Sequence, residues 1–390
     1  MNKDILVIYG ISYFGNSGDS VNERQLINEL CKVLYVKNRI TCIVFTNILL
    51  KNLIKLDVLK RQLLEKPPNL IIVPIYAPNI FLSSFIGLFL SLILYLYVIF
   101  SRHKVYIYTR NSWNALGFIY FPRLRHRLIV KIGALIEDEI QPGKLKRLFI
   151  EASDRHILTK SQWIAVPSPL LLRELALRRG RVTKAIFIPP GIDLKKILKI
   201  KCDKVKKDHY IIGFVGSLFW WQGVDLLVKA AMILTKLKLD KPIRLIIVGD
   251  GPERRKIEQL CRYLGKKCEI TGFVSHEKAL QILSCFDVLV LPSRRTSATN
   301  SNVPIKVLEA WALGIPVITA PHEIYQFLGI ENEKGIIFCK LDPNDIAMKI
   351  VNLFMNWKVF GGVSNGIRHL VYRFCYCNIA SRIAEILLEN

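Results

Sequence analysis

The sequence predicts an α/β protein built from two doubly wound parallel-sheet domains. Short apolar runs alternate with longer segments of helical periodicity, and the alternation restarts after a basic segment, Asp193–His209. Runs that are apolar at every position are typical of strands buried on both faces of a parallel sheet. A chain of 390 residues is also long for a single core, so two domains are expected.

The first half begins with a strand at Ile5–Tyr9 that runs into the glycine-rich loop GISYFGNSGDS. A helix is expected at Val21–Leu34, where apolar residues recur at helical spacing. The other elements expected in this half are the helix Leu49–Leu64 and the strands Thr41–Phe45, Leu70–Ile75, Val105–Tyr108, Leu128–Ile132 and Ile164–Val166.

The second half has the cleaner periodicity. Its expected strands are Ile211–Val215, Leu245–Val248, Cys268–Thr271, Val288–Leu291 and Val317–Thr319, and its expected helices are Val224–Leu237, Arg254–Leu264, Glu277–Cys285 and Pro304–Leu313. Two such sheets with a linker near residue 195 predict a bilobed enzyme with its ligand between the lobes. In open α/β sheets, ligands bind beyond the carboxyl ends of the strands.

The charge and the cysteine content limit the binding partners and the cellular compartment that can be expected. The chain has 56 basic and 31 acidic residues, a formal net charge of +25, which favours nucleotides, nucleic acid or anionic lipid without choosing among them. Its 9 cysteines include no C-x-x-C pair, so free thiols, a reducing cytosolic setting and no zinc site are expected. The N-terminus, MNKDILVIYG, has strand character and does not fit a signal peptide.

A long uncharged stretch interrupts the first half. Between Asn69 and Ser101 no residue is charged, and the segment 79–101 is long enough to cross a bilayer. The flanking runs, Leu70–Ile75 and Val105–Tyr108, both fit strands of one sheet, which a single crossing would separate. We therefore expect the segment to dip into a membrane, with a buried helix and a true span as the alternatives.

The second half carries an ordered set of motifs. They are IPPGID (188–193), GFVGSLFWWQGVDLLVKA (213–230), LIIVGDGPERRKIEQL (245–260), ITGFVSHEKALQIL (270–283), DVLVLPS (287–293) and SNVPIKVLEAWALGIPVI (301–318). In this order and spacing they resemble the family 4 glycosyltransferases, which are retaining, nucleotide-sugar-dependent enzymes of the GT-B type. The resemblance runs from about Ile186 to the C-terminus, and the first half matches only in outline.

The resemblance implies the GT-B architecture, two Rossmann-like domains facing a central cleft. Residues 1–190 would be the acceptor-binding domain with the membrane-associating apolar segment 79–101. Residues 191–370 would bind the nucleotide sugar, and residues 371–390 would form a C-terminal helix that packs back on the N-terminal domain.

The stretch from Ser301 to Ile318 would then hold the donor. Pro304 suits the first position of a helix, which Ser301 or Asn302 could cap, and the free N–H groups of that helix would bind a diphosphate. Lys306 adds a positive charge, and Glu309, on the same face, could accept hydrogen bonds from two ribose hydroxyls. The alternative without a ligand is a surface ion pair between Lys306 and Glu309.

The resemblance extends to further donor-binding positions. Gly216 and Gly223 would let the backbone approach the phosphates, Ser217 could donate its hydroxyl, and Gly272 and Phe273 match the place where the nucleobase packs. A tight turn without a ligand is the alternative for the glycines.

Three positions depart from the family pattern. Ser301, Ser217 and Gln222 stand where many members carry Glu, Arg and Lys. A branch of the family with a P-x-K-x-x-E pattern is similar to PIKVLE here. Either Lys306, with Arg294 or Arg295, takes over phosphate binding, or the chain keeps the fold and has lost the chemistry.

In the first half, Gly15, Asn16 and Gly18 match the family's loop that faces the sugar and the acceptor; a plain flexible loop is an equal alternative. The sequence identifies no catalytic residue; the candidates are Arg110, which ends a strand on the expected cleft side, and Glu137. Glu137, Asp138 and Glu139 follow another apolar run, and one of them could touch the acceptor hydroxyl; a solvated acidic loop is the alternative. The His-Glu pairs at 276–277 and 322–323 have no further ligand at metal-binding spacing, so no metal and no cofactor are expected.

The sequence thus predicts a retaining, hexosyltransferase-type enzyme that moves a sugar from a nucleoside diphosphate sugar to a glycan or lipid-linked acceptor in cell-surface glycan biosynthesis. We expect it in the cytoplasm, peripheral on the anionic inner face of the cell membrane, and not bound to nucleic acid. The alternatives are a non-catalytic subunit that binds nucleotide sugars or lipids, or another GT-B enzyme such as an epimerase. The sequence leaves the sugar, base, acceptor, linkage and oligomeric state open.

Overall fold

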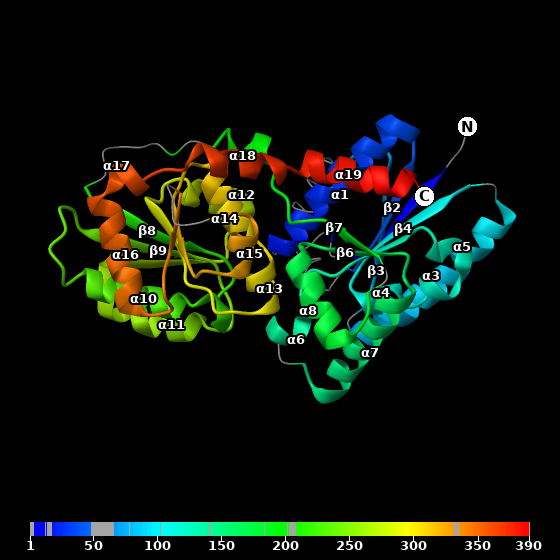
Figure 1. Ribbon diagram of the computed structural model, residues 1–390, viewed down its shortest axis with the longest axis horizontal. Coiled ribbons are helices and arrows are strands. Elements are labelled where there is room, and N and C mark those ends of the chain that lie inside the picture. Colours follow the sequence, from blue (N-terminus) through cyan, green and yellow to red (C-terminus); the bar gives the residue numbers. More distant parts are fainter. Residues whose placement is uncertain are drawn as a thin grey trace. The chain divides into compact units, whose positions relative to one another are not determined.

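The computed structural model describes residues 4–11, 13, 18–47, 66–77, 79–101, 103–139, 142–182, 184–200, 202, 208–330 and 335–389. The chain divides into two compact units, Met1–Gly191 with Tyr376–Asn390, and Ile192–Cys375 (Figure 1). The division after Gly191 adjoins the boundary expected at residue 190, whereas the boundary expected at residue 370 falls inside α18 (Asn365–Arg373). The expected helix Leu49–Leu64 lies outside the described residues.

A seven-stranded sheet with the order β3-β2-β1-β4-β5-β6-β7 forms the centre of the first unit. Every strand pairs parallel with its neighbours. Strand addition reverses direction between β1 and β4, which makes the sheet doubly wound, as predicted. Its strands are β1 (Ile5–Ile11), β2 (Thr41–Asn47), β3 (Leu70–Ile75), β4 (Val105–Arg110), β5 (Leu128–Lys131), β6 (Trp163–Val166) and β7 (Ala185–Phe187).

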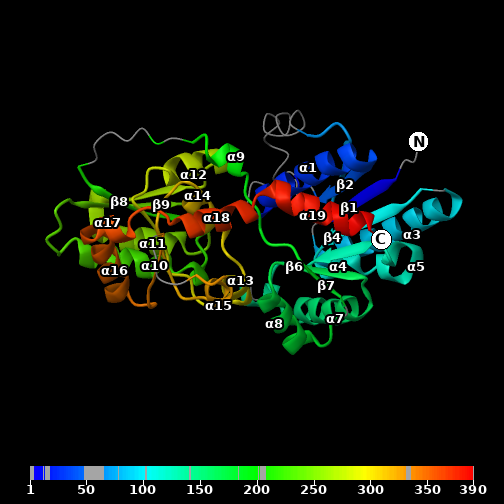
Figure 2. The same cartoon turned by 45° about the horizontal axis from the view of Figure 1, so that its top comes forward.

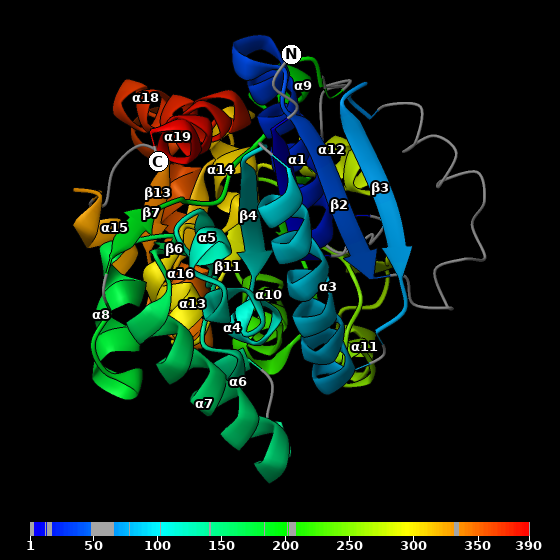
Figure 3. The ribbon, with the colours of Figure 1, turned by 90° about the vertical axis from the view of Figure 1, so that its right-hand side faces the viewer.

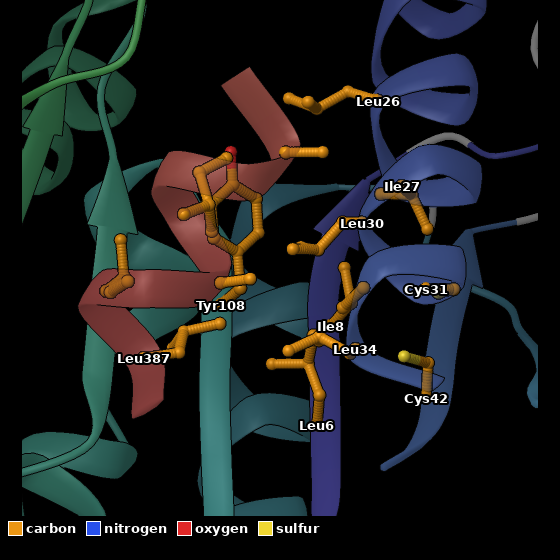
Figure 4. Packing of buried hydrophobic residues seen from close by; sticks show 14 of the residues in the cluster. Leu6, Ile8, Leu26, Ile27, Leu30, Cys31, Leu34, Cys42, Tyr108 and Leu387 are labelled. Carbon is orange, nitrogen blue, oxygen red and sulfur yellow. The ribbon is translucent and has the colours of Figure 1, made fainter. Parts of the chain in front are cut away.

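Helices cover both faces of this sheet, which explains why its strands are apolar at successive positions. Leu6 and Ile8 of β1 point to one face, where α1 (Gly18–Asn38) and α19 (Tyr376–Leu388) lie side by side (Figure 4). Val7 and Tyr9 point to the other. That face carries α3 (Ile80–Phe100), α4 (Ser112–Ala115), η2 (Phe118–Tyr120), α5 (Pro122–Arg125), α7 (Lys144–Lys160) and α8 (Pro169–Arg179) (Figure 3).

The last helix is an integral part of the first unit. Buried residues of α19, among them Ile379 and Leu387, join the same core as Leu30 of α1. Gly191 leaves no room for a side chain, because a Cβ there would lie 2.5 Å from the ring of Tyr376. The chain therefore contributes both its first and its last helix to one face of one sheet.

A buried ionic network ties the helices on the opposite face together. The guanidinium of Arg179 bonds to Glu137 of α6 (Ile136–Glu139), and it bonds to Asp154 of α7 at 3.1 Å. The second partner of Asp154 is the hydroxyl of Ser112, at 2.5 Å. Burial raises the pKa of Asp154, and the bonds from Ser112 and Arg179 oppose that effect. Arg179 thus compensates two carboxylates that have little access to water.

The second unit contains a six-stranded sheet with the order β10-β9-β8-β11-β12-β13, again parallel throughout. Strand addition reverses between β8 and β11. The strands are β8 (Tyr210–Val215), β9 (Ile243–Val248), β10 (Cys268–Gly272), β11 (Val288–Leu291), β12 (Val317–Thr319) and β13 (Ile336–Phe338). All five strands expected here are confirmed within two residues, and β13 is an addition.

The helices of the second unit also lie on two faces (Figure 2). One face carries α10 (Val224–Leu234), α11 (Arg254–Cys261) and α16 (Pro343–Met355), and the other carries α12 (His276–Leu283), α14 (Ile305–Ala312) and α18. The shorter segments are α9 (Leu194–Ile197), η3 (Trp220–Gln222), η4 (Arg262–Lys267), α13 (Ser297–Ser301), α15 (Glu323–Phe327) and α17 (Trp357–Phe360).

The cysteines differ from the expectation of free thiols. Disulfides join Cys202 to Cys285 and Cys261 to Cys268 in the second unit, so the prediction is wrong for these four residues. The first pair is separated by 83 residues, and only the folded chain brings its Cα atoms to 5.3 Å. Cys31, Cys42 and Cys339 are buried free thiols, and burial raises the pKa of Cys339 to about 12.

Replacement of Arg179 by Met is expected to destabilise the first unit strongly. The variant leaves Glu137 and Asp154 buried without their cation, a loss that typically costs about 3–5 kcal/mol. The matched control is Arg178→Met, because Arg178 bonds to Asp138 near the surface, where such pairs contribute at most about 1 kcal/mol. Urea unfolding followed by near-ultraviolet circular dichroism measures both variants, and equal effects of the two changes would contradict the assignment.

Candidate functional site

The candidate site of the second unit lies where strand addition reverses, at the carboxyl ends of β8 and β11. Several close contacts bring the surrounding loops together there. Gly216 after β8 donates to the carbonyl of Val248 at 2.9 Å, and Gly249 donates to the carbonyl of Gly272 at 3.1 Å. A Cβ on Gly223 would lie 1.9 Å from the carbonyl oxygen of Pro292. Ligands of doubly wound sheets bind at such a reversal.

Helix α14 opens at this edge, but not as the sequence predicts. Pro304 has φ −61° and ψ 138°, so it is the extended N-cap residue and the first helical residue is Ile305. The predicted capping by Ser301 or Asn302 is also wrong, because these residues end and flank the separate helix α13. A proline makes no side-chain cap, so the N–H groups of Ile305 and Lys306 receive no bond from its side chain, although its carbonyl accepts from the N–H of Val307 at 2.9 Å.

The ammonium group of Lys306 is enclosed at the glycine turn that follows β8. Its Nζ lies 2.7 Å from Oε1 of the buried Gln222 and 4.6 Å from the centre of the Phe214 ring. A Cβ on Gly216, where φ is +146°, would lie 2.6 Å from Nζ, so another residue there would strain the backbone and displace the amine. Burial lowers the pKa of Lys306 to about 7, although the charge of Glu309 acts in the opposite direction.

Glu309 lies one turn further along α14 and is buried. Its Oε1 is 2.6 Å from Nε2 of His276, the first residue of α12. An ionised carboxylate only accepts hydrogen bonds, so Nε2 carries the proton in this pair. The alternative of a surface ion pair between Lys306 and Glu309 does not occur among the ion pairs of the described residues, in which Glu309 pairs with His276.

The other predicted donor residues lie around the same edge. Ser217 is exposed, and Gly223, with φ +70°, immediately precedes α10. Gly272, with φ +69°, ends β10, and the ring of Phe273 beside it is 55% exposed. Phe273 thus presents an accessible aromatic surface two residues before the N-cap of α12.

Arg294 and Arg295 are engaged elsewhere. Arg294 donates to both carboxylate oxygens of Asp225 at 3.1–3.2 Å and to the carbonyl of Trp220, and Arg295 donates to Glu323 at 2.6 Å. Their guanidinium groups therefore hold loops of the second unit together. Of the three basic residues weighed for the phosphates, Lys306 is the one enclosed at the glycine turn.

The first unit carries a charged cluster at the carboxyl ends of β4 and β5. Arg110 ends β4, and its guanidinium lies 3.8 Å from Glu23 of α1. Lys131 ends β5 and donates to the same carboxylate oxygen of Glu23 at 2.8 Å. Sequence reasoning singled out Arg110 but missed Glu23 and Lys131. The sequence could have indicated both, because Lys131 ends a strand and Glu23 lies near the start of a helix.

The remaining candidates of the first unit fall into two groups. Gly15 and Asn16 lie outside the described residues, and Gly18 is the first residue of α1. Glu137 bonds to the buried Arg179, so its carboxylate takes part in the network that joins α6 to α7 and α8. A carboxylate that contacts an acceptor is expected to face solvent, whereas that of Glu137 pairs with a buried arginine.

In the described part of the chain, no group of three or more His, Cys, Asp or Glu side chains is placed to hold a metal ion. His276, one of the histidines considered for such a role, has the carboxylate of Glu309 as its partner instead.

Comparisons with known proteins agree with this geometry. Residues 209–356 match the family model described as glycosyl transferases group 1. An uncharacterized glycosyltransferase of Methanocaldococcus jannaschii is 28% identical over 304 residues, which cover 74% of each chain. Sucrose-phosphate synthase from Thermosynechococcus elongatus superposes with a TM-score of 0.75 at 18% identity over 99% of both chains. Anabaena HepE, solved with UDP and glucose, gives 0.70 at 14% identity over 99% and 100%.

Residues 209–356 therefore match a group 1 glycosyltransferase domain, and the chain has the GT-B fold, which together support a glycosyltransferase activity.

Proposed function

We propose that the chain is a retaining, family 4 enzyme that transfers a hexose from a nucleoside diphosphate sugar to an acceptor. The observation that carries this proposal is the pair Lys306 and Glu309 on α14, beside the glycine turn of β8. An ammonium group suits the diphosphate, and a carboxylate suits the ribose hydroxyls. HepE, which shares the fold, is a protein solved with UDP, so UDP is the first nucleotide to test.

In this proposal the chain acts mainly on the leaving group. Lys306 and the first N–H groups of α14 stabilise the negative charge that grows on the diphosphate as the anomeric bond breaks. An oxygen of the leaving phosphate then takes the proton of the acceptor hydroxyl, so no dedicated carboxylate base is required. Because the chain supplies its own cation, we propose that no metal or other cofactor takes part.

The first unit would bind the acceptor. Arg110, with Lys131 and Glu23, places a net positive cluster at the strand ends of that unit, which suits an acceptor with an anionic group. We propose a glycan or lipid-linked acceptor, a role in cell-surface glycan biosynthesis, and a location on the cytoplasmic face of the membrane. The apolar outer surface of α3 supports the lipid-linked acceptor.

Incubation of the purified chain with UDP-, GDP- and dTDP-hexoses and a lipid extract tests the reaction. We expect one donor to yield a glycosylated lipid or glycan whose anomeric proton coupling, measured by nuclear magnetic resonance, matches that of the donor, with and without a chelator. An inverted product would contradict retention. Nucleotide binding without turnover on any acceptor would support the alternative of a non-catalytic subunit. Ser217 and Ser301 favour that alternative, because they replace charged residues of the family pattern.

Proton uptake on nucleotide binding tests the role of Lys306. Its pKa near 7 leaves the free amine largely neutral at pH 8–9, and a bound diphosphate raises that pKa. Calorimetric titration with UDP, in buffers of different ionisation enthalpy, is expected to show uptake of about one proton above pH 8 and an affinity that falls up to about tenfold per pH unit. Lys306→Met should bind UDP more weakly without this uptake. The same uptake in both proteins would refute the assignment.

Substitution of Glu309 tests the ribose contact. Glu309→Gln keeps the shape but replaces one accepting oxygen by a donor, and we expect the KM for the donor to rise about 10–100-fold with little change for the acceptor. His276→Gln should reproduce part of this effect, because the carboxylate loses the group that orients it. Glu277→Gln is the matched control, since this neighbour pairs with Lys196 near the surface. A control effect as large as that of Glu309→Gln would argue against a specific contact.

A further inference from the structure

Helix α3 turns its large apolar side chains outward. Ten of them are exposed: Phe81, Leu82, Phe85, Leu88, Phe89, Leu92, Ile93, Leu96, Ile99 and Phe100. The side that faces the protein carries Ser84, Gly87 and Ser91 together with Leu90 and Val98. A helix on the surface of a water-soluble domain has the opposite distribution, with its large apolar residues toward the core. The alternative of a buried helix therefore does not describe α3.

Close packing explains the small residues on the inner side. A Cβ on Gly87 would lie 2.9 Å from the ring of Tyr9, and a Cβ on Gly117 would lie 2.5 Å from the Cα atom of Leu88. The hydroxyls of Ser84 and Ser91 donate to carbonyls of the same helix at 2.8 and 2.6 Å. The small residues Ser84, Gly87 and Ser91 thus let the helix approach the protein closely, and Leu90 and Val98 join the core beside them.

The attachment of α3 to the first unit excludes a simple crossing of the membrane. The helix is long and apolar enough to span a bilayer, but it connects β3 and β4 of one sheet. The hydroxyl of Tyr9 bonds to the carbonyl of Ser83, whose own hydroxyl donates to Asn114 at 2.6 Å. At the other end, the rings of Tyr95 and Phe121 stack with their centres 4.6 Å apart. One side of the helix is therefore always occupied by protein.

We propose that the outward face of α3 lies in the plane of an anionic bilayer and binds the chain to it. Basic residues flank the face on neighbouring elements: Arg123 and Arg125 on α5, and Lys144 and Lys146 on α7. Helix α7 contacts α3 through the rings of Phe149 and Phe81. Its exposed Leu145 extends the apolar surface. An apolar face bordered by cations is complementary to acyl chains under anionic headgroups.

This surface does not depend on the proposed reaction. All of its residues belong to the first unit, and none of them is a proposed donor or acceptor contact. The bilayer is a better occupant than a second copy of the chain, because a copy with the same basic border would place like charges opposite one another. A chain with 56 basic and 31 acidic residues also favours an anionic partner.

Vesicle co-sedimentation of the full chain tests the proposal. We expect binding to vesicles of phosphatidylcholine with phosphatidylglycerol, and a loss of affinity of at least about tenfold in the double variant Phe85→Ser/Phe89→Ser. The control Leu177→Ser/Tyr263→Ser removes two large side chains elsewhere that are more exposed than Phe85 and Phe89, and it should bind as the wild type does. UDP binding should be the same in all three proteins, so a failure here is separate from a failure of the proposed function.

Charge and depth provide two further readouts. Arg123→Glu/Lys144→Glu should bind anionic vesicles more weakly and lose the preference for them over pure phosphatidylcholine. In Phe89→Trp, the added fluorescence should be quenched more by lipids brominated near the headgroup than by lipids brominated near the chain end. Unchanged vesicle binding of Phe85→Ser/Phe89→Ser would overturn the proposal. So would a stable dimer of the wild type that this variant abolishes, since that result would assign the face to a second copy.

Discussion

The position of one ammonium group organises the candidate donor site. Lys306 reaches from α14 into a space bounded by the Phe214 ring, the amide of Gln222 and the backbone of Gly216. A side chain at position 216 would displace the amine, and Gln222 gives the amine a hydrogen-bond acceptor. Because a buried amine favours its neutral form, the site holds a group whose charge depends on what binds beside it.

The central strands of each sheet could be predicted from sequence because they are buried on both faces and therefore read as short, largely apolar runs. The ends of helices were less predictable, as Pro304 shows. The sequence favours it at the first helical position, but its ψ of 138° places it before the helix. The pairs of side chains that contact each other at the candidate sites could not be predicted, for another reason. His276 and Glu309 are 33 positions apart, and Glu23 and Lys131 are 108 apart, so only the fold defines these contacts.

Helix α3 shows what composition alone leaves open. Its residues allow a span, a buried helix or a membrane-dipping helix, because all three need the same apolar content. The distinction comes from which side chains face the protein. Ser84, Gly87 and Ser91 face it, whereas Phe85 and Phe89 are exposed, so the pattern that separates the alternatives is the order of small and large residues around the helix. That order was present in the sequence, but its meaning depends on knowing which side meets Tyr9 and Gly117.

The departures from the family pattern fit a relocated charge better than a lost activity. Gln222 stands where many members carry lysine, and the Nζ atom of Lys306 lies 2.7 Å from its side chain, so a cation from another element reaches the same place. An arginine would stay charged throughout a reaction cycle, whereas this amine can return to its neutral form when an anion leaves. In the proposed reaction the amine would therefore be fully charged beside the bound diphosphate and only about half protonated at pH 7 after its release.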